Sequence, residues 1–452
     1  MKVLGFGRVG KITVTIIGLV SLVAVVAWVG DMVALRSLTP LASSSLDHFS
    51  QFKSVGYEKP PYYPDMQDGE AWDMYGRLSP LLESTNIDKQ FLSRFLGGAS
   101  KDTATAVLVV AQNDSVIVCV KEGVRRRKST TPINYEEGYA LRLPDYMALR
   151  KGARLLACRA RLNARGDPDS ALEDMIDGSV FGQDIAGGDL TLIGHMVGTV
   201  CLRISTRQMH HALSQFSLGQ SQLKKLALSM NTLANTWPPL SGHLDGEFRT
   251  AAVSLTRLPP RKWQYRSVSG PIDLATRFLY WWSVHLRSWR HLFSFRRAVL
   301  SATQFHIEMT EDLARAEQKD WNTVEATVND WMSKLKDNSN WILQASTPNI
   351  MSLHRRRQEG VAHARLAGAG ALIETHFLQN HQWPDKLEVV QTDGLENLLI
   401  DPMSGRPLKY IVYPGADSVV VYSVCLNMVD DGGAVNREKG DLVLVLHSPE
   451  RL

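Results

Sequence analysis

Histidine serves in both catalysis and metal binding, and this 452-residue chain has 13 histidines. The sequence contains no His-Glu-x-x-His, no Gly-x-Ser-x-Gly, no phosphate-binding loop and no dinucleotide glycine fingerprint. His210 and His211 are adjacent on a predicted helix, so their side chains point about 100° apart and cannot easily bind one ion together. His195 and His243 stand alone in the sequence. The sequence therefore predicts no catalytic residue and no cofactor.

Glycine runs and cysteines add no clearer site. Neither residues 97–98 nor residues 187–189 lead from a strand into a capped helix with a following lysine, so we interpret both as loops or helix caps. The cysteines lie far apart within apolar runs, which is typical of buried thiols, at Cys119, Cys158, Cys201 and Cys425. A single disulfide between two of them is the alternative if the body lies outside the cytoplasm.

The charge balance argues against a nucleic-acid partner. The chain carries 50 Lys and Arg against 46 Asp and Glu, a formal net charge of +4 that is spread evenly. Two short basic runs, at residues 125–128 and 355–357, are interpreted as solvated faces or helix ends.

Residues 12–30 contain no charged side chain and come close to the roughly 20 residues that a helix needs to cross a bilayer. Lys2, Arg8 and Lys11 precede this run, and Asp31 follows it. The positive-inside rule then predicts a cytoplasmic tail at residues 1–11, a single transmembrane helix, and a periplasmic body of about 420 residues. A cleaved secretory signal is the alternative, because Val25-Val26-Ala27 suits a signal peptidase. Either way the body is exported.

Residues 31–69 are predicted to form a linker or loosely packed stalk, because serines and the prolines at 60, 61 and 64 occur there with little periodicity. A helical domain is predicted over residues 70–382. Gly166 and the Asp167-Pro168 cap predict two antiparallel helices, which resemble half of a tetratricopeptide-type repeat. No second copy follows at a fixed period, so the body is expected to be an irregular bundle.

Other helices are predicted from apolar residues spaced by three and four. They cover residues 223–233, ending before Pro238, residues 321–335 and residues 366–377. Residues 104–120 are ambiguous, since Val and Ile favour a strand, but their length and neighbours favour a helix.

Residues 274–300 interleave tryptophan, tyrosine and phenylalanine with five arginines. Five arginines argue against a spanning helix. The favoured interpretation is a core helix whose arginines reach solvent, and the alternative is contact with a membrane surface.

Residues 383–452 are predicted to form a small C-terminal module. Alternating or fully apolar runs at residues 408–413, 418–425 and 442–446 predict three strands, separated by Pro414-Gly415 and by residues 430–433. A small antiparallel β meander packed on the preceding helix is expected.

The tail carries a recognisable pattern. It consists of Trp-Pro-Asp-Lys-Leu-Glu at residues 383–388, Asp-Pro-Met-Ser-Gly-Arg-Pro-Leu-Lys-Tyr at 401–410, Tyr422-Ser423 and Asp430-Asp431-Gly432-Gly433. This pattern resembles the tail of a large group of uncharacterised, membrane-anchored bacterial proteins. The similarity extends upstream through the predicted helix pair and residues 361–380. The group implies no activity.

The same tail resembles, more distantly, that of the major pseudopilins of type II secretion, whose corresponding loop binds calcium. The resemblance implies Asp430, Asp431 and Asn427 as calcium ligands, since hard cations favour clustered oxygens. The chain departs from the pseudopilin pattern at Gly10-Lys11-Ile12, which lacks the prepilin cleavage motif, and at Cys425, where glycine is usual.

These observations predict a mainly α protein, tethered to the membrane, that binds or scaffolds a protein partner in the cell envelope. A pseudopilin-like component with a calcium loop is one alternative. A hydrolase whose site forms only in the fold is another.

Overall fold

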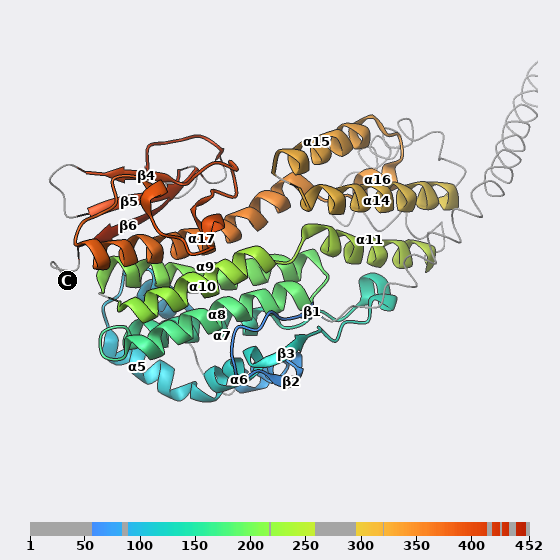
Figure 1. Cartoon of the computed structure of the whole chain (residues 1–452). Helices are drawn as coiled ribbons and strands as arrows, with labels where there is room; N and C mark the ends of the chain where they lie inside the picture. Colours follow the sequence, from blue (N-terminus) through green and yellow to red (C-terminus); the bar gives the residue numbers. More distant parts are fainter. Residues whose placement is uncertain are drawn as a thin grey trace, which may run out of the picture.

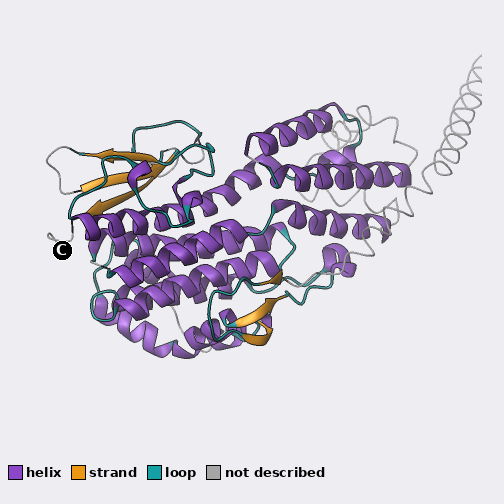
Figure 2. Ribbon diagram, in the orientation of Figure 1, coloured by secondary structure: helices purple, strands orange, loops and turns teal. Residues whose placement is uncertain are grey.

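The computed structural model describes residues 57–83, 89–216, 218–257, 295–319, 321–413, 418–424, 427–433 and 440–448. The chain is mainly helical and has a small antiparallel sheet near its C-terminus (Figure 2), which confirms the predicted class of the body. The predicted membrane helix at residues 12–30 and the aromatic and arginine-rich residues 274–294 lie outside the described residues.

Three consecutive long helices form the centre of the molecule: α7 (Tyr146–Asn163), α8 (Pro168–Gly188) and α9 (Leu192–Gln215). Each begins at a side chain that accepts backbone N–H groups of the first turn, namely Asp145, Asp167 and Thr191. Such caps satisfy N–H groups that have no partner within the helix. The structure confirms the helix pair predicted around Gly166 and Asp167.

The backbones of α8 and α9 are almost in contact where Gly182 meets Gly198. A Cβ atom on Gly182 would lie 2.7 Å from the carbonyl oxygen of Gly198. A Cβ atom on Gly198 would lie 2.7 Å from the Cβ of Ala186. Only glycine fits at this crossing without moving one helix.

Two further helices cover the bundle. Helix α10 (Gln220–Thr236) ends at Trp237, directly before Pro238-Pro239, as predicted. Helix α17 (Ile350–Asn380) packs along α10 and α9 and reaches the C-terminal sheet (Figure 1). Its middle part, from Glu359 to Glu374, is buried nearly all round, because many of its residues are small and allow neighbours to approach.

A second group of helices packs around the N-terminal half of α17: α11 (Leu240–Arg257), α14 (Phe295–Glu317), α15 (Trp321–Asp337) and α16 (Trp341–Ser346). The stripe predicted on α15 is buried as expected, at Trp321, Val324, Val328, Trp331 and Leu335. This group has apolar clusters of its own, separate from the core of the central bundle.

Short helices precede α7 in the chain: α2 (Trp72–Tyr75), α3 (Leu78–Glu83), α4 (Lys89–Leu96), α5 (Thr103–Gln112) and α6 (Asp114–Val124). Figure 1 shows α5 and α6 at the lower edge of the molecule. The ambiguous residues 104–120 are therefore helical, as favoured, but the helix breaks at Asn113. Among the described residues, no single helix is long and apolar enough to cross a membrane; α5 and α6, bent by 66°, meet that test only as a pair.

The chain enters the described body through a small sheet of order β1-β3-β2, formed by β1 (Tyr57–Glu58), β2 (Gln67–Glu70) and β3 (Arg126–Ser129). Strand β1 is antiparallel to β3, and β2 is parallel to it. Residues 57–69 differ from the loose stalk expected there, since Lys59 and Tyr63 are only 6% and 9% exposed. Short strands and coil leave little periodicity in a sequence even where side chains are buried.

The C-terminal module confirms the predicted antiparallel meander, in the order β4-β5-β6: β4 (Lys409–Val412), β5 (Ser418–Ser423) and β6 (Leu442–His447). Two short 3-10 helices precede it, η3 (Leu387–Val389) and η4 (Glu396–Leu399); a third, η1 (Tyr135–Ala140), lies before α7. Leu444 and Leu446 pack against Gly370 of α17, and the Ser214 hydroxyl of α9 donates to the Val445 carbonyl at 2.6 Å.

Replacing Gly182 by alanine tests the close crossing of α8 and α9. We expect Gly182→Ala to lower the free energy of unfolding by about 1–3 kcal/mol, because the added methyl group overpacks the contact. Gly242→Ala on α11 is the control, since nothing lies within 4 Å of a Cβ there and alanine favours helix. Urea unfolding measures both variants. Equal free energies of unfolding for the two variants would contradict the close contact of α8 and α9 at Gly182.

Candidate functional site

Helix α8 carries three fully buried carboxylates, Asp174, Asp177 and Asp184. Steps of three and seven residues place them along one side of the helix. Sequence reasoning missed them because it followed only the apolar residues of this helix. The signal was three acids, at positions 174, 177 and 184, on one side of a helix in which most positions after residue 174 are apolar or small. A buried carboxylate needs a cation or several hydrogen bonds, because losing water is costly.

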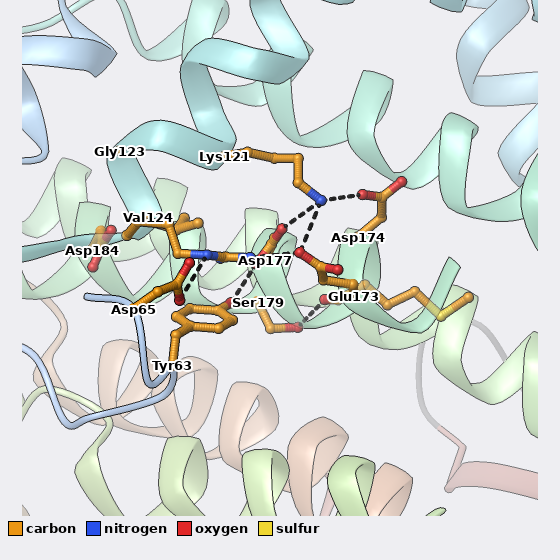
Figure 3. A network of polar contacts seen from close by, with 12 residues as sticks. Tyr63, Asp65, Lys121, Gly123, Val124, Glu173, Asp174, Asp177, Ser179 and Asp184 are labelled. Atoms are coloured by element: carbon orange, nitrogen blue, oxygen red, sulfur yellow. Dashed lines mark hydrogen bonds and ion pairs between the residues drawn. The ribbon is translucent and has the colours of Figure 1, made fainter. Parts of the chain in front are cut away.

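The cations that meet Asp174 and Asp177 come from α6, from the residue that follows α6, and from α7; Figure 3 shows Lys121 of α6 pointing toward these carboxylates. The Lys121 Nζ lies 3.1 Å from Asp174 and 3.1 Å from Asp177. Arg125 binds Asp177 and the half-buried Glu173, each at 2.6 Å. Arg159 on α7 holds Asp174 through two hydrogen bonds of 2.7 and 2.8 Å.

Of the two interpretations of the basic run at residues 125–128, the solvated face is wrong for Arg125, whereas the helix end is confirmed, because Arg125 follows the last residue of α6. Its side chain is only 15% exposed and points into the network, while that of Arg127 is 57% exposed. The Arg125 guanidinium also lies 3.6 Å from the centre of the Tyr63 ring, and the Tyr63 hydroxyl donates to Asp177. A basic run cannot by itself show which of its side chains turns inward.

Asp184 joins the entering segment of the chain to the core. The Lys59 Nζ lies 2.7 Å from Asp184, with both side chains fully buried, and also donates to the carbonyls of Gly123 and Val124. The Tyr75 hydroxyl donates to the same carboxylate. Burial disfavours the charged form of both groups. It therefore raises the pKa of Asp184 to about 6, although Lys59 acts in the opposite direction, and it lowers the pKa of Lys59.

The buried part of the network is balanced in charge, with the cations Lys59, Lys121, Arg125 and Arg159 against the anions Glu173, Asp174, Asp177 and Asp184. Two exposed carboxylates, Asp65 and Asp114, lie at its edge, each 3.8 Å from Arg125 or Arg159. The partners take up most of the hydrogen-bonding positions, although Oδ1 of Asp184 has no hydrogen bond among the described residues. Such saturation suits a structural role better than proton transfer, which needs a group exposed to a substrate.

Histidines that are isolated in the sequence meet in the fold. The rings of His195 and His243 are 4.3 Å apart between centroids, and His243 bonds the carbonyls of Ala186 and Pro239. His354 stacks on Trp321. Within the described part of the chain, neither ring nitrogen of His195 or His354 has a hydrogen bond. Burial lowers the pKa of both rings, that of His354 to about 3.

The predicted calcium ligands lie together on the turn after β5. The Asn427 amide nitrogen donates to Asp431 at 2.7 Å, while Asp430 lies 3.0 Å from the Lys409 Nζ and accepts from Tyr422. Asp441, which sequence reasoning missed, accepts the Gly433 N–H. Across the described ranges, no group of three or more His, Cys, Asp or Glu residues has the geometry of a metal site. The calcium interpretation stays a prediction.

The Asp-Pro-Met-Ser-Gly pattern of the tail has a structural explanation in Asp401. This carboxylate is 1% exposed and accepts the Ser423 hydroxyl at 2.8 Å, the Val424 N–H at 3.1 Å and the Met403 N–H at 2.9 Å. Gly405 takes a positive φ of 66° that closes the turn. The motif thus fixes the turn before β4 to the end of β5.

A groove of about 250 Å³ opens where the helical body meets the C-terminal module. Its lining comes from α10, α17 and the turn before η4: Gln220, Lys224, Ala227, Leu228, Leu372, Thr375, His376, Gln379, Gln391, Thr392, Asp393 and Leu395. Apolar side chains alternate there with amide and hydroxyl groups. Leu228 is 47% exposed and gives the groove an accessible apolar surface.

Comparison with protein families, curated proteins and solved structures finds no match to the chain.

A double-mutant cycle tests the buried pair of Lys59 and Asp184. Lys59→Met leaves a buried carboxylate without its cation, so we expect it to cost about 3–5 kcal/mol of unfolding free energy. The double variant Lys59→Met, Asp184→Asn should cost clearly less than the sum of the single variants. Lys334→Met is the control, because Lys334 and Asp330 pair at 2.7 Å on the exposed face of α15, where about 1 kcal/mol or less is expected. If the losses of unfolding free energy in the two single variants add up to the loss in the double variant, the interaction between Lys59 and Asp184 is contradicted.

Buried neutral histidines predict loss of stability in acid. A histidine with a depressed folded pKa contributes stability above its unfolded pKa of about 6.5, and this contribution is lost as pH falls toward the folded pKa. For His354, whose folded pKa is about 3, the loss at pH 5 is about 2 kcal/mol. His354→Phe keeps the stacking on Trp321 and should reduce the fall in stability between pH 7.5 and 5. An unchanged pH dependence of urea unfolding would contradict a buried, neutral His354.

Proposed function

We propose that the chain is a membrane-tethered, extracytoplasmic binding protein, and that the groove between α10, α17 and the turn before η4 binds an extended peptide segment of a protein partner. The groove supports this proposal because it combines an apolar floor with a rim of side-chain amides and hydroxyls. An extended peptide offers the complementary chemistry, namely backbone N–H and C=O groups with side chains in between.

The floor of the groove is apolar. Ala227, Leu228 and Leu372 lie on facing helices, and Leu395 closes one end. The volume is enough for one or two aliphatic side chains of a bound segment rather than for a large cofactor, since drug-sized pockets start at about 300 Å³.

The rim carries groups that can both donate and accept hydrogen bonds. Gln220, Gln379 and Gln391 contribute amides, and Lys224 and Asp393 contribute one charge of each sign. A rim without excess charge favours a neutral ligand over a phosphate or a polyanion.

The turn that forms one wall is held rigidly. Asp393 and Gly394 take positive φ values of 49° and 89°, and the Leu395 N–H donates to the Thr392 carbonyl at 2.9 Å. The Thr392 hydroxyl donates to Glu396 at 2.9 Å. A preformed wall lowers the entropy cost of binding.

The same groove supports binding better than hydrolysis, although two threonines and a histidine line it. The Thr375 hydroxyl donates to the Ala371 carbonyl of its own helix at 2.8 Å, so it is not hydrogen-bonded to a base.

Peptide selection on the full chain tests the proposal. The chain, in detergent micelles, is panned against a random peptide library, and we expect a group of related peptides that share aliphatic side chains. Leu228→Arg should weaken their binding at least tenfold in fluorescence anisotropy, because it places a charge on the apolar floor.

Ile193→Arg is the matched control, since Ile193 is 48% exposed on α9 and does not line the groove. It should leave the affinity unchanged. A library that yields no related peptides, or peptides equally weakened by both variants, would overturn the groove as the binding site.

A further inference from the structure

Helix α5 has an unusual surface for a helix at the edge of a water-soluble body. Its ten residues contain no charged side chain, and Ala106 is the one that is fully buried. A surface helix ordinarily turns a polar face to water. Here the polar face is missing.

Four exposed residues of α5 form an apolar stripe, while the exposed polar residues Thr103 and Gln112 lie at the two ends of the helix. Ala104, Val107, Leu108 and Ala111 follow one another at helical spacing, and all four are exposed, Val107 by 53% and Leu108 by 60%. Ala106, Val109 and Val110 lie on the other side, which faces the core. Beyond the break, Val118 of α6 extends the exposed set at 43%.

We propose that this stripe lies in the interfacial layer of a lipid bilayer, as a second membrane contact beside the proposed tether. The composition supports lipid, because α5 carries no charged side chain and most of its residues are exposed. Ten residues extend about 15 Å, half the thickness of the hydrocarbon core, so α5 lies along the surface and does not cross it.

The chemistry of the stripe favours lipid over a protein partner. Protein interfaces are enriched in tryptophan, tyrosine and arginine, and the stripe contains none of these; its alanines are depleted at such interfaces. Charged groups stand at the ends of α5, at Asp102 and Asp114, where headgroups and water can reach them.

The path of the chain permits the same orientation. The described body begins at Tyr57 in β1, which pairs with β3, and β3 follows α6 directly. In Figure 1, α5, α6 and β3 follow one another along the same edge of the molecule. Residues 31–56, between the proposed tether and β1, can extend over about 90 Å and therefore allow this edge to reach the bilayer.

Photo-crosslinking in membranes tests the proposal. Leu108 is replaced by p-benzoylphenylalanine in the full chain, which is reconstituted into vesicles of phosphatidylethanolamine and phosphatidylglycerol. We expect lipid adducts, detected by mass spectrometry, at least fivefold more abundant than with the same residue at position 228, which is also exposed but lies on α10. Positions 104 and 111 should give adducts, and position 106 should not.

Other products would overturn the proposal. A covalent dimer would show that a second copy covers the stripe, and a crosslink within the chain would show that one of its own segments does. Equal lipid labelling at positions 108 and 228 would show that α5 has no special contact. Flotation of the chain with the vesicles reports on the tether separately, and peptide binding reports on the groove, so failure of either is distinguishable from failure of the lipid contact.

Discussion

The fold depends on the cations and hydroxyl groups that pair with the three buried carboxylates of α8. Without partners, each would cost several kcal/mol and the helix could not occupy the centre of the bundle. The partners come from three places in the chain: the segment after β1, α6 with the residue that follows it, and α7. Because Lys59 reaches Asp184 and Tyr63 reaches Asp177, the first described residues are fixed to the core rather than hanging from it.

This constraint connects the proposed functions. The entering segment is fixed to α8, β1 pairs with β3, and β3 continues α6, so the position of α5 relative to the start of the body is set by packed elements. On the opposite side of the bundle, α17 carries the C-terminal sheet and one wall of the groove. With α5 on the bilayer, the groove would therefore lie on the side of the body that faces away from the membrane.

The predictions that succeeded rest on local signals. Asp167-Pro168, the double proline after Trp237 and the stripe on α15 each determine a helix end or face within a few residues, and all three were confirmed. The three C-terminal strands were also predicted, because alternating apolar residues are separated by clear turns. The buried network could not be predicted, since Lys59 and Asp184 are 125 residues apart and a lone lysine in a proline-rich stretch looks solvated. The groove likewise exists only when three distant segments meet.

The claim that residues 57–70 belong to the rigid body is tested most directly by hydrogen exchange. The N–H groups of Lys59, Gln67 and Ala71 donate to carbonyls of Arg127, Arg125 and Lys128, at distances from 2.8 to 2.9 Å. If the network holds this segment to α8, these amides exchange only on unfolding of the core and show protection close to that of α8. Exchange within seconds, as in an exposed linker, would contradict the account and restore the stalk that the sequence alone suggested.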